Sequence, residues 1–483
     1  MRTLVAGGRL ISAEGDQTAD VWIEDGRIAA VGSGLPWTAD RTIDAAGRYV
    51  LPGCVDVHTH MEVALIGNAG EDDGDGGGGL VGETTADDFA SGTRAAAFGG
   101  TTTIVDFAEQ APGQTLQETV DGWHAKLARA EAPIDVGFHL IARDLGEHPR
   151  EELAALVEDG VTSVKLFMAY KGDLMVDDDT LWRAMELAAE LDSTVMVHAE
   201  NGDAIHRLVE RARAEGKRGP EFHAATRPCG TEVEAVGRAI ELAKLAGCAL
   251  YVVHVSCAGS VERIEAARAA GWPIFAETCT HYLFADESDL ARPEFEGAKY
   301  VFTPPPRRAG DRERLWRALR TDALSAVSSD HSPASFDARK RLGRDDFAKI
   351  PNGTGGVEER LMLLHHHGVN AGRISLNRMV ELLATNPAKL LGLHPRKGTL
   401  AVGADADLVV FDPEREVTLS AADLHSRSDH TIYEGQVVRG APETVLVRGE
   451  PVVDRGELVA PAGWGEFVPR QPARRRWDTA VAR

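Results

Sequence analysis

The sequence has no uninterrupted apolar run of the roughly 20 residues that a membrane-spanning helix needs. Residues 1–8 at the N-terminus also lack the long apolar segment of a secretion signal. Hydrophobic residues make up 43% of the chain and charged residues 26%, a balance typical of globular proteins. We therefore expect a cytoplasmic protein that makes no contact with a membrane.

Cysteine is also scarce, and no two cysteines form a C-x-x-C pair. The five that occur are scattered: Cys54, Cys229, Cys248, Cys257 and Cys279. This pattern is typical of reduced thiols in a cytoplasm, and it argues against a disulfide framework or a cysteine-rich zinc site.

Positive charge is in deficit. With 52 basic and 75 acidic residues, the formal net charge is −23, which disfavours binding to nucleic acid because like charges repel the phosphates. The one basic cluster, residues 470–476, falls in a C-terminal tail (466–483), which we interpret as solvated or as a contact between subunits. The acidic, glycine-rich stretch 71–79 is predicted to be a mobile loop, without the strand-helix pattern of a phosphate-binding loop.

Both ends of the chain read as short strands with tight turns. In the first 50 residues, two strand-like runs flank Asp25-Gly26, a hairpin signal, and the runs 406–413, 445–447 and 451–453 have the same character. We expect residues 1–50 and 395–465 to form one small β-sandwich domain.

The region between them, residues 51–394, alternates apolar strands with helical patterns such as 231–246 and 179–191. Strands that are apolar almost throughout are typical of a buried parallel sheet. Eight of them predict an α/β fold of the (β/α)₈ barrel type, with a doubly wound sheet as the alternative. The predicted strands are 54–57, 102–107, 135–141, 163–167, 194–197, 250–255, 274–277 and 326–329.

Polar residues converge where these strands end. One residue separates His58 from His60, so in an extended strand both imidazoles point to the same side. Because functional residues of such barrels lie at the carboxyl ends of the strands, the remaining candidates should meet them at one mouth. These candidates are Lys165, His198, His254 and Asp330. Each alone has an ordinary structural explanation, but their convergence predicts a metal site.

The chain resembles the dihydropyrimidinase/hydantoinase family of cyclic amidohydrolases. The matching stretches run from about residue 3 to about residue 455: 52–60, 99–102, 165–171, 197–201, 251–256, 303–307, 329–331, 347–353 and 395–398. The resemblance implies two divalent metal ions, with zinc preferred. His58, His60 and Asp330 would bind the more buried ion, and His198 and His254 the more exposed one. Lys165, carboxylated on its amine, would bridge both ions together with a hydroxide.

The resemblance also implies a reaction and an assembly. Hydroxide would add to the carbonyl of a cyclic amide or ureide, Tyr170 would stabilise the oxyanion, and Asp330 would pass a proton to the departing nitrogen. The backbones at Thr303 and Asn352 would hold the ring. The product would be an N-carbamoyl amino acid, and the enzyme a homotetramer.

The sequence also bears on three other functions of related proteins. Related dihydroorotases carry an arginine for the substrate carboxylate where this chain has Glu62, whose charge would repel an anion. Allantoinase is the second candidate, because residues 277–282 and 332–333 resemble that enzyme. Residues 349–353 and 168–171 instead favour dihydropyrimidinase or hydantoinase. A non-catalytic scaffold relative is disfavoured because all six ligand positions are filled. Ring size and stereochemical preference stay open.

Overall fold

The computed structural model describes residues 1–34, 37–67 and 79–472. The predicted mobile loop at 71–79 therefore lies, except for its last residue, outside the described part of the chain, as does most of the basic cluster at 470–476. Within the described residues, no helix is both long and apolar enough to span a membrane.

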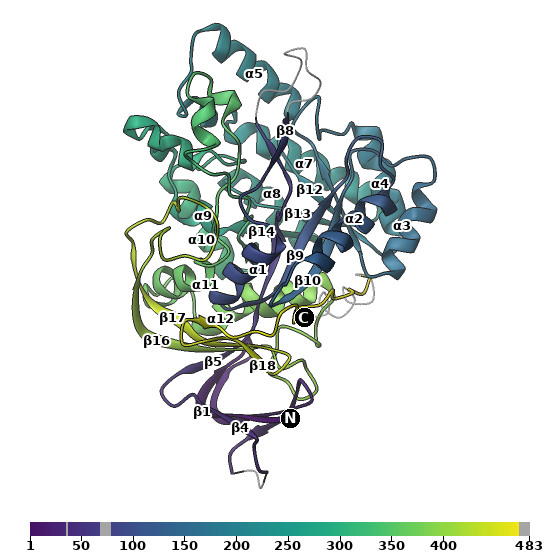
Figure 1. Cartoon of the computed structure of the whole chain (residues 1–483). Coiled ribbons are helices and arrows are strands. Elements are labelled where there is room, and N and C mark those ends of the chain that lie inside the picture. The colour runs from purple at the N-terminus through teal and green to yellow at the C-terminus, as the bar shows by residue number, and fades with distance from the viewer. Residues whose placement is uncertain (35–36, 68–78, 473–483) are drawn as a thin grey trace.

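Eight parallel strands form the sheet that the sequence predicts, hydrogen-bonded in the order β15-β14-β13-β12-β11-β10-β9-β6. The two ends of the sheet meet where Thr59 and His331 form a parallel bridge and His60 N–H donates to the His331 carbonyl at 2.9 Å. The result is a barrel (Figure 1). Its strands are β6 (Cys54–Thr59), β9 (Thr101–Glu109), β10 (Asp135–Ile141), β11 (Ser163–Phe167), β12 (Thr194–His198), β13 (Ala249–Val252), β14 (Ile274–Cys279) and β15 (Ala326–Ser328).

Two strands end earlier than predicted, for a visible backbone reason. β13 stops at Val252, although the apolar run continues to 255, and β15 stops at Ser328. His254 (φ 40°) and Asp330 (φ 48°) lie in the left-handed region just beyond these ends. A strand cannot continue through such a conformation, so the chain turns at the residues predicted to be ligands.

The helices cover the outside of the barrel. In α7, buried Val236, Ile240 and Ala243 follow helical spacing, and Gly247 at φ 72° ends the helix. The α-helices are α1 (Phe89–Phe98), α2 (Leu116–Arg129), α3 (Pro149–Glu158), α4 (Asp178–Glu190), α5 (Gly202–Ala214), α6 (Phe222–Thr226), α7 (Cys229–Ala246), α8 (Ala258–Ala269), α9 (Thr280–Phe284), α10 (Ala309–Arg320), α11 (Arg360–Leu363), α12 (Leu376–Val380) and α13 (Asn386–Leu391). Shorter or irregular turns are η1 (Glu287–Ala291), η2 (Pro293–Tyr300), η3 (Lys340–Gly343), η4 (Phe347–Lys349), η5 (Leu364–Asn370) and η6 (Glu381–Thr385).

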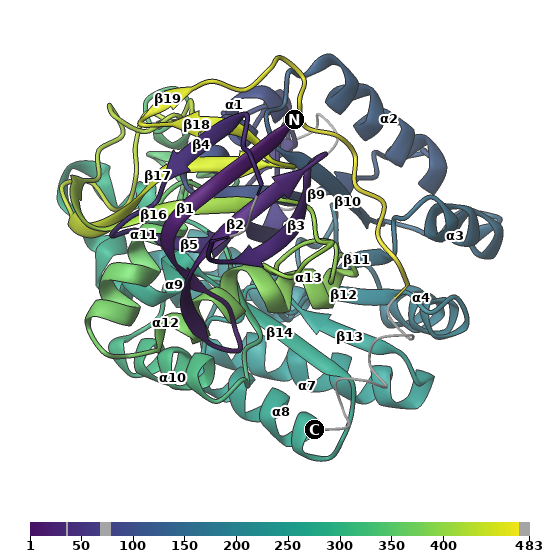
Figure 2. The same cartoon turned by 90° about the horizontal axis from the view of Figure 1, so that it is seen from below.

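Both chain ends join in one nine-stranded mixed sheet, as expected, with β5 of the first half paired to β16 of the second. Val21, Val50 and Leu408 belong to the apolar core of this sheet, which Figure 2 shows across the lower end of the barrel. Its strands are β1 (Arg2–Ile11), β2 (Asp16–Glu24), β3 (Arg27–Gly32), β4 (Arg41–Asp44), β5 (Tyr49–Pro52), β16 (Leu408–Thr418), β17 (Val437–Val447), β18 (Glu450–Asp454) and β19 (Glu457–Leu458). A separate hairpin pairs β7 (Ala64–Ile66) with β8 (Gly79–Thr84). The exact domain boundaries stay a prediction.

The described part of the C-terminal tail is packed, which corrects its interpretation as solvated. Val468 is fully buried among barrel strands, and its N–H donates to the Val136 carbonyl at 2.9 Å. Arg470 is 4% exposed and donates to Ser163 Oγ at 2.8 Å and to the Phe138 carbonyl at 2.5 Å. Apolar contacts and buried hydrogen bonds thus hold the tail against β10 and β11.

Candidate metal centre and active site

The strand β6 and the turn after β15 bring three ligand-type side chains together. Nε2 of His58 lies 3.2 Å from Nε2 of His60, and Asp330 Oδ1 lies 3.1 Å and 3.4 Å from these two nitrogens. These three residues form a group whose atoms could hold a metal ion. Burial lowers the pKa of both imidazoles, which therefore stay neutral and retain a lone pair, while the surrounding histidines hold the Asp330 carboxyl well below its usual pKa.

Lys165 enters this group from the middle of β11. Its Nζ lies 3.0 Å from His58 Nε2 and 4.1 Å from the centre of the Phe107 ring, and the residue is 1% exposed. None of the described carboxylates forms a direct ion pair with it. Burial lowers the pKa of the Lys165 ammonium to about 8, against a smaller opposing effect of Asp330, so a neutral amine is accessible near neutral pH.

His198 and His254 form a second pair beside the first group. Their ring centroids are 4.5 Å apart, and the His254 ring lies 5.5 Å from that of His58. Nδ1 of His254 is buried without a hydrogen-bond partner among the described residues. Five of the six predicted ligands line one pocket at the mouth of the barrel. The sixth, His58, lies behind them.

Two buried carboxylates that we did not predict as site residues orient these histidines. Glu277, within β14, lies 2.5 Å from His58 Nδ1 and also accepts from Tyr251 Oη at 2.9 Å. Glu200 lies 2.8 Å from His198 Nε2 and pairs with Arg227 at 2.7 Å. Such partners fix which ring nitrogen of each histidine would face a metal ion. The signal was present in the sequence, because Glu277 is the last residue of the predicted apolar strand 274–277, and functional residues are expected at such ends.

The predicted substrate-binding residues line the same pocket. Tyr170, Thr303 and Asn352 all line it, and Asn352 Nδ2 donates to Tyr170 Oη at 3.3 Å. Burial raises the pKa of Tyr170 to about 12, so the phenol keeps its proton at neutral pH. Tyr170 also has a left-handed backbone, with φ 64°. Strained backbone at Tyr170, His254 and Asp330 is the pattern expected where function outweighs local stability.

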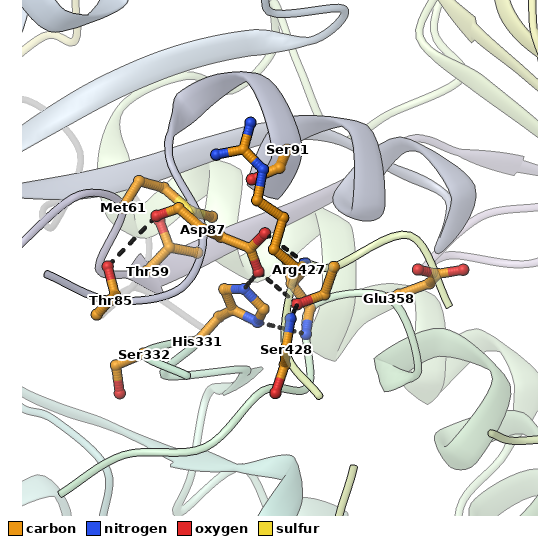
Figure 3. Close-up of polar contacts among 12 residues, drawn as sticks. Thr59, Met61, Thr85, Asp87, Ser91, His331, Ser332, Glu358, Arg427 and Ser428 are labelled. Carbon is orange, nitrogen blue, oxygen red and sulfur yellow. Dashed lines mark hydrogen bonds and ion pairs between the residues drawn. The ribbon is translucent and has the colours of Figure 1, made fainter. Parts of the chain in front are cut away.

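His331, which follows Asp330, is held from behind. Its Nε2 lies 2.9 Å from Asp87 Oδ2, and its Nδ1 accepts the Gly356 N–H at 3.2 Å. Asp87 in turn accepts from Ser426 Oγ. It also accepts from the Arg427 N–H (Figure 3). His331 therefore supports the position of Asp330 and does not line the pocket.

Glu62 does not line the pocket. Its side chain pairs with Arg129 at 2.9 Å, and its backbone has φ 55°. The repulsion of an anionic substrate by Glu62 therefore stays a prediction.

A barrel that gathers buried histidines, a lysine and an aspartate at one mouth is the architecture of a metal-dependent hydrolase. Comparison with known proteins specifies which one. The amidohydrolase family matches residues 49–452. D-hydantoinase of Rhizobium radiobacter is 47% identical over 98% of this chain and 99% of its own length, and D-hydantoinase of Streptomyces coelicolor is 48% identical over 97% and 98%. The crystal structure of dihydropyrimidinase from Brevibacillus agri superimposes with a TM-score of 0.93 at 45% identity, covering 98% of this chain and 99% of that one. The chain belongs to the D-hydantoinase/dihydropyrimidinase family of amidohydrolases, and it is an enzyme.

Proposed function

We propose that this enzyme hydrolyses the ring amide of dihydropyrimidines and hydantoins and releases N-carbamoyl amino acids. The observation that carries the proposal is the convergence of His58, His60, Lys165 and Asp330 within a barrel that is 47% identical to D-hydantoinase over nearly its whole length. The relatives named above favour this function over allantoin hydrolysis.

The donor set fits two divalent cations. Glu277 lies 2.5 Å from Nδ1 of His58, so Nε2 of the same ring faces His60, Asp330 and Lys165. Imidazole nitrogens and a carboxylate gathered in this way suit a divalent cation such as zinc. We assign His58, His60 and Asp330 to one ion, His198 and His254 to the other, and carboxylated Lys165 to both.

Carboxylation of Lys165 explains why a lysine lies in this position. A buried ammonium without a paired carboxylate costs free energy, whereas a neutral amine can attack CO₂ and become an anion with two oxygens. That anion would supply the charge that two cations need, and its stem would stay packed against Phe107 and Phe167.

Each remaining residue then has a chemical role. When bound, the two ions polarise the amide carbonyl and supply hydroxide near neutral pH. The Tyr170 phenol, protonated because its pKa is about 12, donates to the developing oxyanion. Asp330 accepts the proton of the nucleophile and delivers it to the departing ring nitrogen. The backbones at Thr303 and Asn352 hold the ring in place.

We also propose a homotetramer in the cytoplasm, with the small sheet domain at 1–50 and 395–465, the barrel at 51–394 and a tail at 466–483. The full-length similarity to dihydropyrimidinase and D-hydantoinase supports this organisation. Light scattering of the purified enzyme tests the assembly directly, and a monomer in solution contradicts it.

A hydrolysis panel tests the function. Purified enzyme is incubated separately with dihydrouracil, hydantoin, an aryl-hydantoin and allantoin, and the carbamoyl product is quantified. We expect kcat/KM to be highest for a dihydropyrimidine or a hydantoin. Asp330→Asn, which keeps the shape of the side chain, serves as the inactive control. Allantoin as the best substrate, or turnover that survives in the control, contradicts the proposal.

A further inference from the structure

Lys340 is a second lysine buried without a paired carboxylate, and it lies outside the metal site. It begins the turn η3 and has no exposed surface. Its Nζ donates to the Val301 carbonyl at 2.8 Å and to the Pro351 carbonyl at 3.0 Å. One amine thus connects two segments that are 50 residues apart in sequence.

These two segments carry the proposed substrate contacts. Val301 precedes Thr303 by two residues, and Pro351 directly precedes Asn352, both of which line the pocket. Other backbone hydrogen bonds complete the junction: Gly353 N–H donates to the Val301 carbonyl at 3.2 Å, and Asn352 N–H donates to the Ile66 carbonyl at 2.9 Å. Lys340 therefore acts on the substrate wall from behind, without touching the pocket itself.

Packing alone does not explain a lysine here. Burial lowers the pKa of the Lys340 ammonium to about 7, and the charge of Asp429 offsets this only in part. Burying an amine in such surroundings costs free energy, whereas burying a methionine of similar length would not carry this cost. What the amine adds is its N–H donors: one binds the Pro351 carbonyl, and another binds the Val301 carbonyl, which also accepts from Gly353 N–H.

The turn that carries Lys340 is fixed in its own right. Lys340 N–H donates to the Ser335 carbonyl at 2.9 Å. Asp429 accepts from Ser335 Oγ at 2.7 Å, from Phe336 N–H at 2.7 Å and from Asp337 N–H at 2.9 Å. These hydrogen bonds hold the Lys340 amine in one place, so that it can bind the segments at Val301 and Pro351 together.

We propose that Lys340 is a positioning residue, which sets the spacing of the two backbone segments that hold the cyclic amide. The identity of the substrate in this statement rests on the proposed function. The role itself concerns the geometry of residues 301–303 and 351–353, which can be measured without substrate.

The test compares Lys340→Met with wild type and with Val21→Ala, a core truncation in the small sheet far from the pocket. For each protein, kcat and KM are measured on the best cyclic amide, and hydrogen exchange is followed by mass spectrometry. Because the wall binds the ring in the ground state and the transition state alike, Lys340→Met should raise KM about tenfold and change kcat less than about threefold. Exchange in 301–304 and 351–353 should accelerate in this variant alone.

An unchanged KM, or equal exchange in those segments, overturns the role of Lys340. If wild type opens no cyclic amide, the proposed function fails, but the exchange comparison still decides whether Lys340 holds the two segments. If Lys340→Met does not fold, Asp429→Asn loosens the turn while keeping the amine, and the same two readouts apply with the same expected direction.

Discussion

Lys165 lies inside the barrel with its amine 3.0 Å from His58 Nε2 and its stem beside the rings of Phe107 and Phe167. If Lys165 is carboxylated as proposed, neither a shorter nor a neutral side chain would place two anionic oxygens between His58 and His254. At the scale of one residue, the proposed function therefore depends on the proposed modification of this amine.

We predict that Lys165→Ala lowers kcat/KM at least about 100-fold, since metal affinity and the bridging charge are lost together. Acetate or propionate should restore part of the activity of this variant by occupying the vacated space with a carboxylate. Wild type assayed with the same acids is the control and should not be stimulated. Full activity of Lys165→Ala without added acid rules out the carboxylated bridge.

Ligand residues could be predicted because strand periodicity and strand ends can be read locally. His58, His198 and His254 follow short apolar runs, so their meeting at one mouth follows from the barrel. Glu62 could not be read in this way, because its positive φ and its pairing with Arg129 depend on a turn and on a helix 67 residues away. The carbonyl contacts of Lys340 are equally non-local, since nothing in its neighbouring sequence indicates Val301 or Pro351.

At the scale of elements, the segment 419–436 between β16 and β17 connects the small sheet to the active site. Its backbone and side chains reach Asp87, at the N-terminal end of α1, through Ser426 and Arg427, while Asp429 holds the turn of Lys340. Burial disfavours the Asp87 charge, but hydrogen bonds from His331, Arg427 and Ser426 outweigh it and hold the pKa of the Asp87 carboxyl well below its usual value. One connecting segment therefore supports both walls of the site.

Because the folded state lowers the pKa of Asp87, its contribution to stability is present above the unfolded pKa of about 3.9 and is lost as pH falls through the lower folded value. Asp87→Asn should therefore lower the stability by about 2 kcal/mol at pH 7, and this loss should shrink below about pH 4. Melting temperatures at pH 7, 5 and 3 measure the difference. Asp25→Asn, at an exposed turn, is the control and should leave the melting temperature unchanged at each pH. A loss that is equal at all three values contradicts the ionised, paired Asp87.

In the molecule as a whole, the nine-stranded sheet and the eight-stranded barrel have different roles. The nine-stranded sheet joins both ends of the chain, and the described tail packs Val468 and Arg470 against the barrel strands. The barrel can then place strained residues at its mouth, because its neighbouring strands are hydrogen-bonded to one another and buried. The joined ends were predictable from matching strand and turn patterns, whereas the packed tail was not, since its basic composition resembles that of a solvated segment.

We propose that two cations per chain, held by the six ligands, carry the hydrolysis. Metal is removed from the purified enzyme with a chelator, and zinc is returned in steps while metal content and cyclic-amide turnover are measured together. We predict that the metal-free enzyme stays folded but inactive, and that turnover returns and levels off at about two ions per chain. Full turnover by metal-free protein, or a plateau reached at one ion, would contradict the account.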